Sequence, residues 1–290
     1  MRFEGAYTAL VTPFAADGSV DYGQLRALVE EQVAGGVAGV VPVGTSGESP
    51  TLTHKEHVDV IRAVVEAVAG RIQVIAGAGS NSTAEALQLT RGAIEAGADA
   101  TLQVAPYYNR PTQAMLVKHF SVLADLGKPV VLYNIPGRTG VEIGVETVKE
   151  LSRHPMIQCV KEAGGSVDRV SKTLQACDIA VLSGDDSLTL PMMAVGARGV
   201  VSVVTNVAPR PIVEMVRAAL EGRFGDALEL HRKWYPLMTG LFLETNPVPV
   251  KAALELAGKG VARYRGPLDR MSEGNLEKLR GIMAGLGLVR

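Results

Sequence analysis

The sequence predicts an α/β protein, a (β/α)8 (TIM) barrel followed by a C-terminal helical extension. Eight short apolar runs rich in β-branched residues recur along the chain and show no polar alternation. Such runs are typical of parallel strands that are covered on both faces. Helical patterns separate the runs, and this alternation favours a barrel. The expected strands are residues 6–11, 37–43, 72–76, 100–104, 129–133, 157–161, 179–182 and 199–203.

The stretches between the early strands carry helix signals at both ends. Thr53 with Glu56, and Ser82 with Glu85, have the capping-box spacing, and Asp21 precedes the first helical pattern. Most of these stretches stop at a glycine, as left-handed C-caps require. We therefore expect helices at residues 22–35, 55–69, 84–96 and 113–125.

An open doubly wound sheet is the alternative fold. It would place a glycine-rich phosphate loop after its first strand, whereas this chain continues there as Thr12-Pro13-Phe14. The barrel is therefore the better interpretation. Helical signals continue beyond the eighth strand, so we expect a barrel domain at residues 1–222 and an extension at 223–290. The signals lie at residues 211–221, 225–238, 249–258 and 272–284.

Composition narrows the class of protein. Of the 290 residues, 47% are hydrophobic and 20% charged, and the net charge is -1, so neither nucleic acid nor an anionic membrane is an expected partner. Cys159 and Cys177 match no metal or redox motif. The N-terminus has no signal-type apolar stretch, and no apolar run is long enough to span a bilayer. We expect a cytoplasmic protein.

Lys161 is the first candidate catalytic residue. It ends the apolar run 157–161, whereas lysines such as Lys55 and Lys278 stand in polar context. Burial would strip water from its ammonium group and favour the free amine, which can form a Schiff base with a carbonyl compound. The alternative is a lysine that only extends to the rim of a strand.

Other candidates follow the strands that end at the same barrel mouth. Thr45 and Ser46, between two glycines, can present hydroxyl and backbone N–H groups to a carboxylate, although an ordinary turn would have the same composition. Tyr133 could relay protons, or could be a rim aromatic residue. Arg138 could bind a carboxylate with two parallel hydrogen bonds, or could form a surface ion pair.

A metal site is not expected. Asp185 and Asp186 precede a helical pattern and are interpreted as its caps. His54 and His57 have helical spacing but no evident third ligand. Strand eight is not followed by a glycine-rich turn, so the substrate is expected to carry no phosphate.

Five segments resemble the dihydrodipicolinate synthase family, within the N-acetylneuraminate lyase superfamily. The resemblance runs in order from about residue 5 to about residue 260, and it implies a barrel enzyme that condenses pyruvate with L-aspartate 4-semialdehyde to 4-hydroxy-tetrahydrodipicolinate in lysine biosynthesis. It also implies a homotetramer, a dimer of dimers, and no cofactor beyond the covalent imine between lysine and pyruvate. The segments are 44–48 (GTSGE), 106–111 (PYYNRP), 133–140 (YNIPGRTG), 160–163 (VKEA) and 182–186 (LSGDD).

The resemblance also implies roles for individual residues. Lys161 forms the imine, and Thr45, Tyr133 and Tyr108 relay protons, with Tyr108 supplied by the adjacent subunit. Ser46 and Arg138 bind the carboxylates of pyruvate and of the semialdehyde. The family commonly has threonine at position 46, and serine keeps the hydroxyl. Gly184 and Val201 are expected to line the pyruvate pocket with their carbonyls.

A regulatory site is implied as well. Family members that are inhibited by L-lysine bind it at a dimer interface, where Glu85 would pair with the amine and His57 would contact its side chain. Pro50 stands where many members have alanine. The alternative is a set of polar groups that happen to face a cavity. The matching positions are Ser49, Pro50, His54, His57, Asn81, Glu85 and Tyr107.

Two other functions remain as alternatives. N-Acetylneuraminate lyases and 2-keto-3-deoxy sugar-acid aldolases use the same lysine and tyrosine, but they generally lack an arginine at the position of Arg138. A non-catalytic relative would have lost the lysine or a relay hydroxyl, and this sequence retains them.

Overall fold

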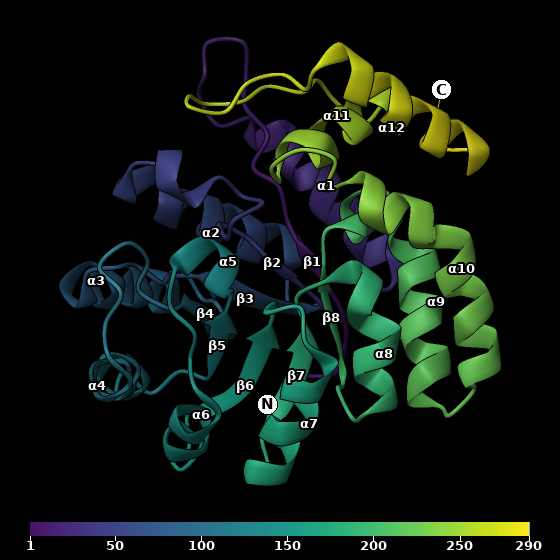
Figure 1. Cartoon of the computed structure of the whole chain (residues 1–290). Coiled ribbons are helices and arrows are strands. Elements are labelled where there is room, and N and C mark those ends of the chain that lie inside the picture. The colour runs from purple at the N-terminus through teal and green to yellow at the C-terminus, as the bar shows by residue number, and fades with distance from the viewer. Residues whose placement is uncertain (290) are drawn as a thin grey trace.

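A closed barrel of eight parallel strands, in the order of the chain, forms the centre of the molecule (Figure 1). The computed structural model describes residues 1–289. All eight predicted strands are confirmed, each with ends within two residues of those expected. They are β1 (Gly5–Ala9), β2 (Gly39–Val41), β3 (Gln73–Gly77), β4 (Ala100–Val104), β5 (Val130–Asn134), β6 (Ile157–Glu162), β7 (Ala180–Ser183) and β8 (Gly199–Ser202).

Strands β1 and β8 close the barrel, with Tyr7 paired to Val201 in the ladder. The backbones approach each other closely at the start of this ladder, where a Cβ on Gly199 would overlap the carbonyl group of Gly5. Gly199 also has a φ of 149°, which L side chains rarely adopt. Glycine at position 199 therefore allows the last strand to join the first.

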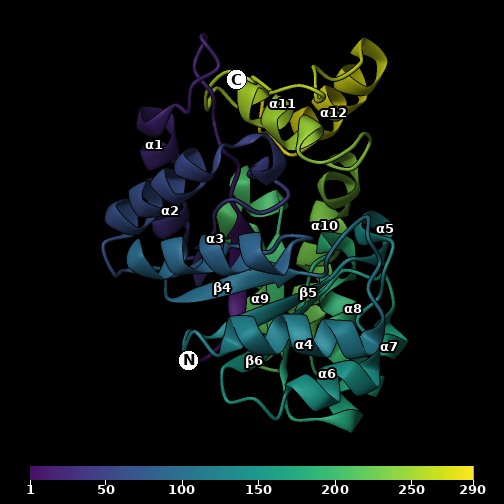
Figure 2. The ribbon, with the colours of Figure 1, turned by 90° about the vertical axis from the view of Figure 1, so that its left-hand side faces the viewer.

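Helices cover the outside of the barrel and shield the outer face of the sheet from water (Figures 1 and 2), while the side chains of the strands fill its interior. The four helices expected between the early strands are present, within one residue of the predicted bounds. The ring consists of α1 (Tyr22–Gly35), α2 (His54–Val68), α3 (Thr83–Glu95), α4 (Gln113–Ala124), α5 (Pro136–Thr139), α6 (Val145–Leu151), α7 (Val167–Ala176), α8 (Thr189–Ala194) and α9 (Pro209–Leu220), with short turns η1 (Ser49–Thr51), η2 (Asp186–Leu188) and η3 (Val204–Asn206).

The predicted helix caps are confirmed in two cases and half right in the third. Asp21 accepts a hydrogen bond from the N–H of Gln24, and Thr53 forms a complete capping box. Ser82 accepts the N–H of Glu85, but the Glu85 carboxylate does not return to Ser82. It is diverted to the side chains of Ser80 and His54. The box predicted at the start of α3 is therefore wrong, because a cluster of polar side chains competes for its acid.

The expectation that Asp185 and Asp186 cap the helix that follows them is wrong, because neither side chain makes a cap hydrogen bond there. The buried Asp186 carboxylate accepts hydrogen bonds from the Ser202 hydroxyl and from the N–H groups of Val203 (2.9 Å) and Val204 (3.3 Å). It therefore supports the turn after β8. Burial raises the pKa of Asp186 to about 6, although these three donors favour the carboxylate.

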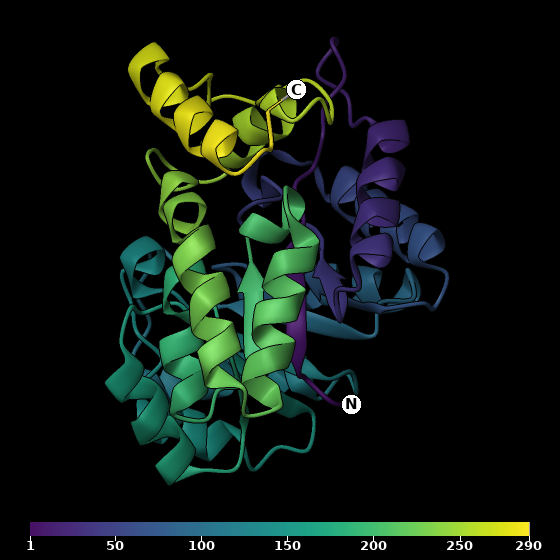
Figure 3. The same cartoon turned by 90° about the vertical axis from the view of Figure 1, so that its right-hand side faces the viewer.

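The predicted C-terminal extension consists of α10 (Phe224–Gly240), α11 (Val248–Leu256) and α12 (Glu273–Gly285). Helix α10 runs beside α9, whereas α11 and α12 lie beyond the barrel on the side where the strands end (Figure 3). None of the helices formed by residues 1–289 is both long and apolar enough to cross a bilayer.

Candidate active site

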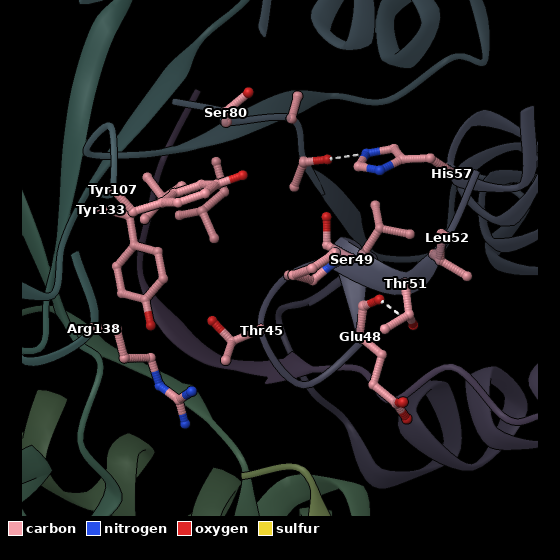
Figure 4. Close-up of a pocket in the computed structure, with 18 of the residues that line it drawn as sticks. Thr45, Glu48, Ser49, Thr51, Leu52, His57, Ser80, Tyr107, Tyr133 and Arg138 are labelled. Atoms are coloured by element: carbon pink, nitrogen blue, oxygen red, sulfur yellow. Dashed lines mark hydrogen bonds between the residues drawn. The ribbon is translucent and has the colours of Figure 1, made fainter. Parts of the chain in front are cut away.

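A cavity of about 560 Å³ opens where the strands end. It is lined by loops that follow β2, β3, β4 and β5 and by the segment between α10 and α11. Figure 4 shows Thr45, Tyr133 and Arg138 gathered on one side of it, with Ser49, Leu52 and His57 on the other. The cavity therefore joins two groups of residues that the sequence assigns to different roles.

Lys161 and Tyr133 are paired across neighbouring strands. They are ladder partners in β6 and β5, so their side chains leave the sheet on the same face. The Lys161 Nζ lies 4.0 Å from the centre of the Tyr133 ring. Only 6% of Lys161 and 5% of Tyr133 is exposed. An amine and a phenol are thus held together next to the cavity, as imine chemistry with proton transfer requires.

A hydrogen-bond network on the outside of the barrel holds the strand ends that carry Tyr133 and Lys161. Asn134 and Glu162 are the next ladder partners, and the Asn134 amide donates to both Glu162 carboxylate oxygens at 2.9 and 3.1 Å. Arg169 of α7 donates to the same carboxylate at 2.8 Å. This buried network ties the ends of β5 and β6 together and so sets the spacing between the Tyr133 and Lys161 side chains.

Gly184, directly after β7, leaves room for the lysine. A Cβ at this position would lie 3.1 Å from Lys161 Cε and 2.6 Å from Ala163 Cβ. The Gly184 N–H also donates to the Glu162 carbonyl at 2.7 Å. A side chain here would press on the lysine, so glycine leaves room for the Lys161 side chain, which lies beside Tyr133 and is not itself among the residues that line the cavity.

Residues 44–48 form a tight loop after β2. The N–H of Gly47 donates to the Gly44 carbonyl at 3.1 Å, and a Cβ on Gly47 would lie only 2.8 Å from the Val43 nitrogen. Glycine is therefore required at position 47. This turn directs Thr45 into the cavity, whereas Ser46 is buried beneath it, where its Oγ accepts a hydrogen bond from Asn246.

The remaining predicted site residues take three different positions. Arg138, on α5, lines the cavity and donates from Nη2 to the Asn246 carbonyl at 3.2 Å. Val201 is buried within β8. Tyr108 is 90% exposed and lies outside the cavity lining, so this chain alone does not bring it to Tyr133.

Six of the seven predicted effector residues line the same cavity, and Figure 4 shows Tyr107 beside Tyr133 and Ser49 and His57 on the opposite side. The six are Ser49, Pro50, His54, His57, Glu85 and Tyr107. Asn81 is not part of this lining, and its carbonyl accepts a hydrogen bond from the Asn109 amide at 2.8 Å.

The charges of the part of the cavity around Glu85 and His57 follow from its hydrogen bonds. The Glu85 carboxylate accepts from the Ser80 hydroxyl and lies 2.6 Å from His54 Nε2, and these contacts hold its pKa below the ordinary value. His57 donates its Nε2–H to the Gly77 carbonyl at 2.7 Å. Burial lowers the pKa of His57, so its imidazole is neutral at pH 7. This part of the cavity therefore presents the Glu85 carboxylate, held by Ser80 and His54, and the neutral His57 ring, held by the Gly77 carbonyl.

Sequence reasoning missed the contribution of the C-terminal extension. Asn246 touches both Ser46 and Arg138, and Lys251 forms a buried ion pair with Glu48. The only local signal was the placement of polar residues within the apolar segment around α11. Within residues 1–289, no group of three or more His, Cys, Asp or Glu side chains is arranged to hold a metal ion.

The fold and the site define a class of protein, a (β/α)8 barrel with a buried lysine at the carboxyl ends of its strands, and comparison with known proteins narrows this class to one family. The model of the dihydrodipicolinate synthetase family matches residues 2–285. The 4-hydroxy-tetrahydrodipicolinate synthase of Geobacter sulfurreducens is 49% identical over 290 residues, covering 99% of this chain and 100% of that one. The chain belongs to the dihydrodipicolinate synthetase family.

Solved structures agree with this assignment. The dihydrodipicolinate synthase of Aquifex aeolicus superposes with a TM-score of 0.97 at 48% identity, covering 99% of each chain. The enzyme of Cyanidioschyzon merolae, with lysine bound, superposes with a TM-score of 0.96 at 41% identity, again over 99% of each chain.

Proposed function

We propose that this protein condenses pyruvate with L-aspartate 4-semialdehyde to 4-hydroxy-tetrahydrodipicolinate, a step of lysine biosynthesis. The observation that carries the proposal is the Lys161 amine held against the Tyr133 ring, next to a cavity that Thr45 and Arg138 also line. Full-length relatives at 48–49% identity with this activity support it.

Lys161 would begin the reaction. Its amine adds to the ketone carbon of pyruvate, and water leaves to give a protonated imine. The imine withdraws electrons, so a methyl proton is lost and an enamine forms. The enamine carbon attacks the aldehyde carbon of the second substrate, whose oxygen becomes a hydroxyl group. The substrate amine then attacks the imine carbon, which closes the ring and releases Lys161.

The other residues would bind the substrates and move protons. The Thr45 and Tyr133 hydroxyls carry protons to and from the reacting oxygen, because both side chains reach the cavity. Ser46 binds the pyruvate carboxylate, and the carbonyls of Gly184 and Val201 line its pocket. Arg138 binds the carboxylate of the semialdehyde, since its guanidinium group is presented to the same cavity.

Turnover with a panel of substrates tests this proposal. Product formation from pyruvate and the semialdehyde, coupled to a reductase that consumes the cyclic product, is expected in the wild type and absent in Lys161→Ala. The same preparation is offered N-acetylneuraminate and a 2-keto-3-deoxy sugar acid. Cleavage of a sugar acid without condensation would show instead that Arg138 does not select a short carboxylate substrate.

The proton relay requires a second copy of the chain. We propose that Tyr108 enters the site of a neighbouring subunit, and that the protein forms a homotetramer built as a dimer of dimers. The support is the 90% exposure of Tyr108 beside the mouth of its own barrel. Sedimentation equilibrium measures the assembly, and a fully active monomer would contradict the proposal.

L-Lysine is the proposed effector. The carboxylate of Glu85 suits its amine, and a homologue is known with lysine bound. Ser49, Pro50, His54, His57, Asn81 and Tyr107 are the other proposed residues of this site. Calorimetry with L-lysine is the test, and no heat or change in rate at millimolar concentration would exclude the site.

The free thiols of Cys159 and Cys177 support a reducing compartment, and we propose the cytoplasm. We also propose that the barrel comprises residues 1–222 and the extension 223–290, of which residue 290 lies outside the described residues. Limited proteolysis should cut near this junction if the two parts can separate.

A further inference from the structure

Asn246 lies between α10 and α11 and contacts both proposed carboxylate-binding residues. Its side-chain Nδ2 donates to Ser46 Oγ at 2.9 Å, and its backbone carbonyl accepts from Arg138 Nη2 at 3.2 Å. The residue is 6% exposed and borders the cavity. One residue of the C-terminal extension thus connects the two proposed substrate subsites.

The direction of the Asn246–Ser46 hydrogen bond matters for anion binding. A hydroxyl can accept and donate at the same time. Because the amide N–H occupies an acceptor position of Ser46 Oγ, the hydroxyl proton remains available for a substrate carboxylate. Donation from an amide also polarises the hydroxyl and strengthens it as a donor. The contact therefore prepares Ser46 to bind an anion.

The side-chain oxygen of Asn246 suggests that this asparagine does not serve the stability of the fold alone. The Asn246 Oδ1 is buried and has no hydrogen-bond partner among residues 1–289. A buried unpaired carbonyl oxygen destabilises the fold. Asparagine is thus a poor choice for packing at this position but a suitable one for donating to Ser46.

A second contact fixes the same segment to the same loop. Lys251 of α11 forms a buried ion pair with Glu48, and the N–H of Arg265 donates to the other Glu48 oxygen at 3.2 Å. The extension therefore holds the loop after β2 on both sides of Gly47, at Ser46 and at Glu48.

We propose that Asn246 is a positioning residue that sets the affinity for pyruvate by orienting the Ser46 hydroxyl. This inference rests on the proposed function, in which Ser46 binds the pyruvate carboxylate. The contact with Arg138 uses only the backbone of Asn246, so side-chain substitutions should alter the second substrate's KM much less than the pyruvate KM.

The experiment compares Asn246→Ala and Asn246→Asp with the wild type. Loss of one neutral hydrogen bond should raise the pyruvate KM roughly 5- to 10-fold in Asn246→Ala. A carboxylate at position 246 would accept the Ser46 proton and repel the substrate, so Asn246→Asp should raise it roughly 30- to 100-fold. The KM of the semialdehyde should stay within about two- to threefold.

Borohydride trapping with pyruvate alone provides a second readout. The pyruvate concentration for half-maximal trapping on Lys161, measured by mass spectrometry, should move by the same factors as the KM. Trapping requires no second substrate. Wild-type protein that traps pyruvate but does not condense it would disprove the proposed reaction and leave the role of Asn246 measurable.

Two controls separate positioning from folding. Asn275→Ala removes an amide that donates to Glu244 Oε1 at 3.0 Å, also in the extension, and should not change either KM. In a Ser46→Ala background, Asn246→Ala should add less than about a twofold further effect, because its target is gone. If Asn246→Asp does not fold, the effect of Asn246→Ala on the pyruvate KM, measured with and without the Ser46 hydroxyl, still tests whether Asn246 acts through Ser46.

Two results would overturn the proposal. One is a pyruvate KM within about twofold of wild type in folded Asn246→Ala. The other is an effect of Asn246→Ala that persists undiminished without the Ser46 hydroxyl, because that would assign the residue to fold stability alone.

Discussion

Two buried lysines in this protein have opposite environments. Lys161 and Lys251 are 6% and 4% exposed, and each Nζ lies close to an aromatic ring, at 4.0 Å from Tyr133 and 4.2 Å from Phe14. Lys251 is paired with the Glu48 carboxylate and donates to the Arg263 carbonyl at 2.8 Å. Among residues 1–289, Lys161 forms no ion pair. Burial alone therefore does not make a lysine a nucleophile.

The difference lies in what surrounds each amine. The Glu48 carboxylate favours the ammonium form of Lys251 and occupies its protons, although burial lowers its pKa overall. Lys161 instead faces the phenol of Tyr133 and lies beside Gly184, which leaves room for its side chain. The absence of an ion-pair partner within residues 1–289 and a position beside Tyr133, which lines the cavity, distinguish Lys161, the proposed nucleophile.

The largest expected effect is the loss of activity in Lys161→Ala, by about 10⁵-fold or more, because no other group can form the imine. Lys251→Met should keep a measurable rate and trap pyruvate with borohydride. Mass spectrometry of the trapped protein checks both variants. Wild-type protein in which pyruvate is trapped on Lys251 would show that Lys251, and not Lys161, is the nucleophile.

Tyr133→Phe removes the hydroxyl but keeps the ring beside Lys161. We expect the rate to fall about 10²- to 10⁴-fold, since a relay without its phenol must pass protons through water. Steady-state kinetics measures the change, and borohydride trapping shows whether the imine still forms. Unaltered turnover would remove Tyr133 from the relay.

Glu48→Gln leaves the Lys251 amine buried without its carboxylate partner. The free energy of unfolding should fall by about 3–5 kcal/mol, whereas replacing both partners with methionine should recover much of it. Denaturant titration followed by circular dichroism measures all three proteins. A loss below about 1 kcal/mol would show that the pair is effectively solvated.

The smallest effect concerns pH. Burial holds the pKa of folded Lys251 below its ordinary value of about 10.4, so the folded state releases this proton first as pH rises. A neutral Lys251 is therefore easier to bury than a charged one. The contribution of this difference to the free energy of unfolding is complete above the Lys251 pKa of the unfolded state, and it is lost as pH falls through the Lys251 pKa of the folded state. Relative to Lys251→Met, the wild type should gain stability as pH rises toward the unfolded pKa of about 10.4. If the free energies of unfolding of the two proteins change in parallel with pH, the pKa of Lys251 is not lowered in the folded state.

Sequence reasoning succeeded where the structure depends on neighbouring segments. The apolar runs predict the strands because strands covered on both faces need no polar alternation. Tyr133 and Lys161 stand at the ends of consecutive strands, so the barrel order places them side by side. The resemblance to the family then suggested what each residue does.

The contacts that the sequence could not predict join distant segments. Asn246 and Ser46 are 200 positions apart, and Lys251 and Glu48 are 203 apart. No periodicity connects them, because packing of the extension on the barrel decides which loop the extension meets. The failed capping box at Ser82 has the same origin, since Ser80 and His54 compete for Glu85.

The position of Glu48 has a consequence for synthesis. This residue is made early, but its carboxylate is bound by the Lys251 side chain and the Arg265 backbone, which are made near the end of the chain. A nascent protein that has formed all eight strands still lacks the groups that hold the loop around Ser46. Translation must pass residue 265 before that loop can reach its final form, so shortened products would contain a barrel whose first substrate subsite is incomplete.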